Sequence, residues 1–200
     1  MKKALLLLLL VLAGAGSAKA QKVALKHNFV WDALKTPNLS LEVAMGRKWT
    51  VDTHLGMNHF LYTTNPTASN YKTKKLSHWM LQPEARYWLC DVFNGWYIGA
   101  HAHGGIFNCG GISIPFVLQN KNHVMRHHRY EGHFYGGGIS TGYQWVLSKR
   151  FNLEASLGVG YARIFYDKYK CTTCGQRLGN GNADYLGVTK AAVSVVYFFK

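Results

Sequence analysis

Four cysteines and a group of histidines could carry chemistry in this sequence. Cys171 and Cys174 form a Cys-x-x-Cys pair, which is half of a tetrahedral zinc site, and Cys109, His127 and His128 could supply the missing ligands. In an exported loop, a disulfide between Cys171 and Cys174, or from either one to Cys109, fits the same residues. We favour a disulfide, and we expect neither a bound metal nor a cofactor.

The sequence supports an acid/base site less strongly than it supports a disulfide or a zinc site. His101 and His103 are two residues apart and therefore point the same way along a strand, where they could contribute to a metal or acid/base site. Glu84 and Glu154 could act as a carboxylate pair, but nothing in the sequence fixes their separation. Ordinary polar residues inside a barrel explain the same pattern, so we predict no catalytic residue.

The elements that must position these side chains show a period of two. Apolar and polar or small residues alternate through eight segments, and glycine recurs on one face only. The expected strands cover residues 22–31, 41–46, 49–58, 78–89, 96–107, 135–145, 152–161 and 193–199.

Two architectures use eight alternating antiparallel strands: a soluble barrel or sandwich with its apolar faces inward, and a membrane barrel with them outward. Aromatic residues at the strand ends and the length of the strands favour the membrane. The short links 46–48, 90–95 and 147–150 also alternate with the long links 59–76, 108–132 and 167–183, whereas the first outer link, 33–38, is modest. We therefore predict an all-β, eight-stranded antiparallel up-and-down transmembrane β-barrel of a Gram-negative outer membrane.

The first residues have the layout of a secretory signal. Lys2 and Lys3 precede an apolar run, small residues follow, and Ala18 and Ala20 suit a cleavage site. The run is too short to span a bilayer, which argues against a retained anchor. We expect a signal peptide at 1–20 and a barrel domain at 21–200.

The interior of an eight-stranded barrel is just wide enough for side chains to fill it. Charged residues that alternate onto the inner face must then neutralise one another, which predicts a plug and not a pore. The expected lumen charge network consists of Glu42, Asp52, Glu84, Arg86, Glu154 and Lys190.

The chain is basic, with a formal charge of +14 from 23 Lys and Arg against 9 Asp and Glu. An exported protein rarely meets nucleic acid, so the phosphates of outer-membrane lipid and lipopolysaccharide are the better partners. We expect nine basic residues to lie in the long outer links and to contact phosphate or an acidic surface protein: Lys72, Lys74, Lys75, Lys121, Arg126, Arg129, Lys168, Lys170 and Arg177.

Several segments also resemble a known family. The runs 26–28, 36–39, 82–88, 171–175 and 187–191 are similar to bacterial outer-membrane proteins grouped as domain of unknown function 3575, across nearly all of the mature chain. The resemblance implies a barrel similar in size to OmpA and OmpX, and a setting similar to that of fimbria-associated and other cell-surface components. It implies no activity.

The expected function is therefore a non-enzymatic structural or surface-interaction role. Two other classes stay open: an outer-membrane lipid-modifying enzyme, and capture of metal or haem by the histidine-rich loop from His123 to His133. Some small barrels modify lipid A through a Ser or His near the outer leaflet, and no matching Ser and His pair occurs in this sequence.

Overall fold

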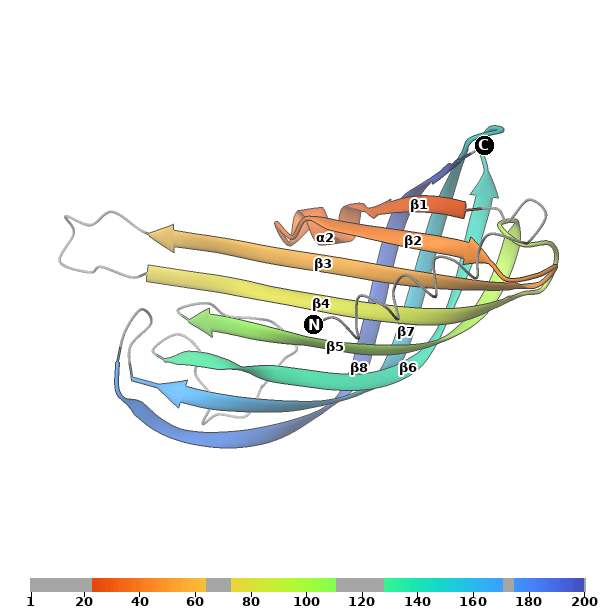
Figure 1. Ribbon diagram of the computed structural model, residues 1–200. Helices are drawn as coiled ribbons and strands as arrows, with labels where there is room; N and C mark the ends of the chain where they lie inside the picture. Colours follow the sequence, from red (N-terminus) through yellow and green to blue (C-terminus); the bar gives the residue numbers. More distant parts are fainter. Residues whose placement is uncertain (1–22, 64–72, 111–127, 171–174, 200) are drawn as a thin grey trace, which may run out of the picture.

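The computed structural model describes residues 23–63, 73–110, 128–170 and 175–199. Each strand pairs antiparallel with the next, and the first pairs with the last, which closes the sheet into a barrel. No helix in these ranges is long and apolar enough to cross a membrane. The elements are β1 (Val23–Asn28), α2 (Phe29–Ala33), β2 (Asn38–Ala44), β3 (Trp49–Thr63), β4 (Thr73–Trp88), β5 (Gly95–Gly110), β6 (Arg129–Val146), β7 (Phe151–Tyr169) and β8 (Arg177–Phe198) (Figure 1).

The two faces of the sheet have the reverse polarity of a soluble barrel. Along β2 and β3, Glu42 and Asp52 are buried inside, whereas Leu41 and Val51 are exposed outside. In the described ranges, twenty-one buried residues are polar or charged against twelve that are apolar. The polar side of the alternating pattern therefore faces the interior of the barrel. The soluble barrel or sandwich with its apolar faces inward does not fit this burial pattern.

At some positions of the inner face, an aromatic ring lies across a glycine. A Cβ on Gly142 would come within 2.6 Å of the Tyr97 hydroxyl, and one on Gly56 within 2.2 Å of the Trp31 ring. A barrel this narrow has no room for two side chains at such crossings. Glycine on one strand thus makes space for a ring from another.

The short-link end of the barrel is closed by apolar packing. The link between β4 and β5 turns inward at Phe93, which has a φ of 64° and packs among Trp88, Tyr97 and Val196. Asn152 donates a hydrogen bond to the Phe93 carbonyl at 2.9 Å, which holds the turn. β1 begins and β8 ends at this same end of the barrel.

At the opposite end, the far end, the strands are longer than their sequence pattern predicted. β3, β4, β5, β6, β7 and β8 continue through much of what the sequence suggested were long links. The predicted first strand, 22–31, is instead too long, because β1 ends at Asn28 and α2 follows. The Asn28 side chain accepts a hydrogen bond from the Val30 amide at 3.0 Å, so it begins the helix where alternation alone suggested more strand.

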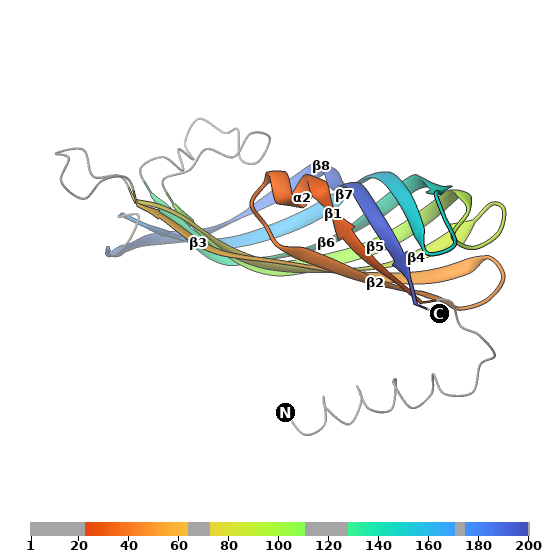
Figure 2. The same cartoon turned by 90° about the horizontal axis from the view of Figure 1, so that it is seen from above.

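β1 and β2 therefore stop well short of their neighbours. Figure 1 shows β3 and β4 extending far past α2, and Figure 2 shows the longer strands continuing beyond α2 as a thin curved sheet. Within the described residues, the sheet is a closed barrel at the short-link end, and at the far end six strands continue without β1 and β2.

Candidate functional site: the buried charge network

Arg86, on β4, is the centre of a cluster of buried charges. Its guanidinium donates to Glu84 and Asp52 at 2.7 Å, to Glu42 at 2.9 Å and to Glu154 at 3.0 Å. Arginine suits this position because its planar fork offers five donors and stays charged. One side chain thereby connects four carboxylates from β2, β3, β4 and β7.

Strand register explains why the carboxylates gather. Glu42 pairs directly with Asp52 across β2 and β3, and Asp52 pairs with Glu84 across β3 and β4. Residues directly opposite in a sheet point to the same side, so three negative charges form one row on the inner wall. Without cations beside them, that row would repel itself.

Two lysines complete the cluster. Lys190, on β8, forms an ion pair with Glu84, and Lys26, on β1, forms ion pairs with Glu42 and with Glu154, the latter at 2.8 Å. The structure thus brings together all six residues expected in the lumen. Lys26 is an addition that sequence reasoning missed, because the opening strand alternates less regularly than the others.

Neutral donors satisfy the second oxygen of Glu42, Glu84 and Glu154, whereas Asp52 Oδ1 has no hydrogen-bond partner among the described residues. Thr50 donates to Glu42, Ser140 donates to Glu84, and the Tyr97 hydroxyl donates to Glu154 at 2.9 Å. Hydrogen-bonded partners on all sides are what make buried charge tolerable. The cluster contains four acidic and three basic groups, and it spans the lumen from wall to wall.

The space left around these charges is small. A cavity of about 20 Å³ lies beside Asp52, His54 and Lys190. That is room for about one water molecule. The cluster therefore acts as a core that ties opposite walls of the barrel together, and it leaves no aqueous path at this level.

The inner-face histidines lie just beyond the charge network. The His101 and His103 rings are 5.7 Å apart, and His101 hydrogen-bonds to the Thr189 hydroxyl at 2.9 Å. His54 hydrogen-bonds to the Ser40 hydroxyl and packs against the Trp31 ring. Within the described residues, no group of three or more His, Cys, Asp or Glu side chains is placed to hold a metal ion.

The cysteines are not assembled in the described ranges. Cys109 is a free thiol at the far end of β5, where it is buried against Tyr130 and Tyr166, and Cys90 is free and exposed in a short link. Cys171, Cys174 and His127 lie outside the described residues, and His128 immediately precedes β6.

The predicted phosphate-contacting residues are only partly in links. Lys74, Lys75, Arg129, Lys168 and Arg177 lie within strands, which corrects their assignment to loops, because the hairpins continue pairing past the apolar segments. Lys170 lies just after β7, whereas Lys72, Lys121 and Arg126 lie outside the described residues.

Two of those arginines already have acidic partners. Arg177 donates to Asp167 at 2.6 Å, and Arg129 lies 3.7 Å from Glu131 with its guanidinium over the Tyr169 ring. These contacts neutralise part of the charge that the sequence seemed to concentrate at the far end. Exposed pairs of this kind add little stability, but they make the arginines less available to phosphate.

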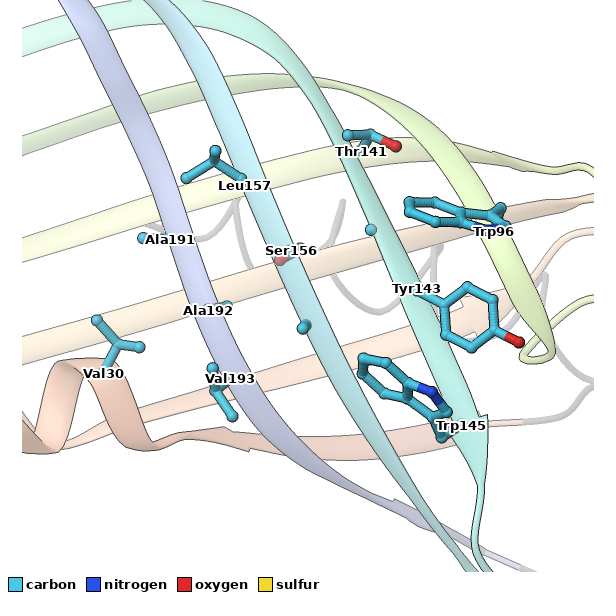
Figure 3. Close-up of a pocket in the computed structure, with 12 residues that line it drawn as sticks. Val30, Trp96, Thr141, Tyr143, Trp145, Ser156, Leu157, Ala191, Ala192 and Val193 are labelled. Atoms are coloured by element: carbon cyan, nitrogen blue, oxygen red, sulfur yellow. The ribbon is translucent and has the colours of Figure 1, made fainter.

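The outer wall carries an apolar groove of about 570 Å³. Small residues of β6, β7 and β8, including Gly142, Ala155 and Ala191, form its floor, and Figure 3 shows Trp96 and Trp145 on one side and Val30 of α2 on the other. Such a groove can accept an apolar chain.

Comparison with known protein families identifies the chain's family. A family model described as "Protein of unknown function (DUF3575)" matches residues 5–199, which is almost the whole chain. No curated protein sequence matches significantly.

Proposed function

We propose that this chain, which belongs to the DUF3575 family, is an integral barrel of a bacterial outer membrane with a structural or surface-interaction role and no enzymatic activity. The observation that carries the proposal is the reversed polarity of the barrel. Its inner face holds six buried charges, whereas its outer face exposes large apolar side chains such as Ile98, Ile139 and Leu157. An apolar outer wall is stable in lipid and costly in water.

Aromatic contacts on the outer face support this setting. At the short-link end, rings of neighbouring strands touch in three places with centroids 5.2 Å apart: Trp49 with Tyr87, Trp96 with Tyr143, and Phe151 with Tyr197. Bands of aromatic rings are typical of the level where a membrane barrel meets lipid headgroups. The apolar groove beside Trp96 and Trp145 would then be filled by lipid acyl chains.

The orientation follows from the links. If the short-link end faces the periplasm, the far end and its longer links face outward, as outer-membrane barrels require. A secretory signal at 1–20 would deliver the chain, and this segment lies outside the described residues. A non-enzymatic role fits a lumen whose charged groups are occupied with one another.

Fractionation and gel mobility test the membrane assignment. The protein should remain with outer membranes after carbonate washing, and boiled and unboiled samples should migrate differently, because such barrels resist detergent until heated. A soluble protein with one mobility would contradict the proposal. Activity on labelled lipid A would instead favour the lipid-modifying alternative, and haem or metal retained by the purified protein would favour capture.

For the surface-interaction part, we propose that the basic residues that the sequence places in or beside the long links contact lipopolysaccharide phosphates. Replacing Lys72, Lys74, Lys75, Lys121 and Arg126 by Gln should lower lipopolysaccharide retention, and salt should do the same, since screening weakens exposed charges. The matched control replaces Arg129 and Arg177, which already have partners, and should change retention less. Retention that is insensitive to both salt and the first set would contradict phosphate contact.

A further inference from the structure

The turns at the short-link end carry a basic rim, which consists of Arg47, Lys48, Lys149 and Arg150. All four residues are exposed, and the turns 45–48, 89–94 and 147–150 contain one acidic residue, Asp91. No acidic group of the described ranges forms an ion pair with any of the four. The rim is therefore suited to an anionic partner.

The rim lies next to the aromatic contacts of the outer wall. Lys48 immediately precedes Trp49 in the chain, and Arg150 immediately precedes Phe151. Trp49 and Phe151 both belong to the ring contacts at this end of the barrel. In a membrane, aromatic rings of this kind lie at the level of the headgroups, and the long side chains of lysine and arginine extend from there toward the phosphates. In that setting, the rim would lie at the phosphates of one leaflet.

The apolar groove of the outer wall lies on the strands that one turn of this rim joins. β6, β7 and β8 form its floor, Trp145 of β6 lines it, and the turn 147–150 immediately follows β6. The Arg150 carbonyl accepts a hydrogen bond from the Phe198 amide at 3.0 Å, which ties this turn to the end of β8. Lys149 and Arg150 are therefore held beside the three strands that form the floor of the groove.

The groove and the turn together indicate what binds there. The groove is lined mainly by apolar and small residues, which suits a hydrocarbon chain. Lys149 and Arg150 attract a phosphate, and the ammonium group of a zwitterionic headgroup would weaken that attraction. A hydrocarbon chain that ends in a phosphate without an accompanying cation belongs to an anionic glycerophospholipid. Lipopolysaccharide shares this chemistry, but in the orientation proposed above it lies in the opposite leaflet.

We propose that the groove and the turn 147–150 bind an anionic glycerophospholipid of the leaflet that the short-link end faces. An acyl chain lies on the floor formed by β6, β7 and β8, and the phosphate lies at Lys149 and Arg150. The inference rests on the membrane setting proposed above and adds a lipid class to it. It is separate from the lipopolysaccharide contact proposed for the far end, because it uses other residues at the opposite end of the barrel.

Quenching by tail-brominated lipids of two headgroup types tests the site. Bimane is attached to Val159→Cys, which lies on the outer face of β7 two residues beyond the groove residue Leu157, in a background without the native cysteines. The vesicles are phosphatidylcholine with a minor amount of brominated lipid, either phosphatidylglycerol or phosphatidylcholine. We expect brominated phosphatidylglycerol to bind at the label with an apparent affinity at least about threefold higher than brominated phosphatidylcholine, because two cations attract its headgroup.

A matched pair of charge variants locates the headgroup. Replacing Lys149 and Arg150 by Gln should remove the preference, so that the two brominated lipids quench equally. Replacing Arg47 and Lys48 by Gln is the control, because their turn joins β2 to β3 on the opposite side of the barrel, and it should leave the preference at Val159 unchanged. Since all four residues are exposed, both variants should keep the heat-dependent gel shift.

A second pair of variants tests the shape of the groove. Ala155→Leu fills part of the floor of the groove without changing any charge, and it should lower the preference for phosphatidylglycerol. Ala85→Leu, on the outer face of β4 and outside the groove, is the control and should not.

The remaining outcomes overturn the inference. Equal quenching by the two lipids in the unsubstituted protein would do so, and so would a preference that survives the loss of Lys149 and Arg150. A preference that falls equally when Arg47 and Lys48 are replaced would show only a general attraction to the rim. In each case, quenching by both lipids leaves the membrane assignment standing while the lipid site fails.

A bimane label at Leu81, on the outer face of β4, separates the last two outcomes. Quenching at Leu81 with none at Val159 would mean that another protein chain, such as a second copy, covers the groove, and the lipid site would be wrong. No quenching at either position would contradict the membrane assignment itself.

Discussion

Arg86 contacts four carboxylates at once, so the stability of the barrel depends on it more than on any single neighbour. A buried ion pair gains little over an apolar pair of the same shape, yet loss of one partner leaves charge stranded. Without Arg86, four carboxylates would share only Lys26 and Lys190 as cationic partners.

We expect Arg86→Met to lower the free energy of unfolding by about 3–5 kcal/mol or more. Urea unfolding in lipid vesicles, followed by the gel shift, measures this. Arg47→Met is the control, because Arg47 is exposed in a short link and should change stability by less than about 0.5 kcal/mol. If Arg86→Met and Arg47→Met had the same free energy of unfolding, the claim that the stability of the barrel depends on Arg86 would be wrong.

Steric limits act at the residue scale as well. A Cβ on Gly136 would lie 2.0 Å from the Tyr161 carbonyl oxygen and 2.7 Å from the Ala162 Cα, whereas one on Gly46 would meet nothing within 4 Å. Gly136→Ala should therefore cost about 1–3 kcal/mol, as overpacking does, and Gly46→Ala should be nearly neutral. The same urea unfolding assay compares the two variants. If Gly136→Ala left the free energy of unfolding unchanged, the backbone of β7 beside Gly136 must be able to move to make room for the methyl group.

Among the elements, α2 begins at a side chain that also contacts β8. Asn28 accepts from the Val30 amide at 3.0 Å and from the Val193 amide at 3.2 Å, and its amide group donates to Ala191. The residue thereby ends β1, begins the helix and continues the ladder of β8.

Asn28→Ala should lower stability by about 1–3 kcal/mol, since it leaves buried backbone groups without partners. It should also speed hydrogen exchange of α2 while the exchange of β4 to β6 changes little. Asn94→Ala, in an exposed link, serves as the control. Unchanged exchange in α2 would show that packing alone holds the helix.

The sequence predicted the elements where alternation is strong and missed them where other forces act. The inner positions of Glu42, Asp52 and Glu84 follow from period two, which also predicts that they are close. α2 depends on one asparagine cap, and the far parts of the strands depend on pairing between residues of mixed polarity. Neither leaves a periodic signal. Which acid contacts which base depends on register and barrel closure, which no local pattern reveals.

For the whole molecule, the ion-paired side chains that fill the lumen imply a core that excludes bulk water. The cavity beside the charge network holds about 20 Å³, and Phe93 with its neighbours closes the short-link end. We expect no steady single-channel current in planar bilayers, because ions would have to displace bonded charges. Reproducible conductance of the purified protein would contradict a core without bulk water. Brief, rare current openings after urea is added would be consistent with partial unfolding of that core.

The central claim is that the apolar outer wall contacts lipid, and fluorescence quenching by lipid tails tests it most directly. Single cysteines labelled with bimane are introduced at the outward-facing Ile139 and Leu157 and at the inward-facing Ser140, in a background without the native cysteines, in vesicles of tail-brominated phospholipid. Strong quenching at Ile139 and Leu157, with little at Ser140, is the predicted result. Equal quenching at all three sites, or none at Ile139 and Leu157, would contradict the claim that this wall lies in a membrane.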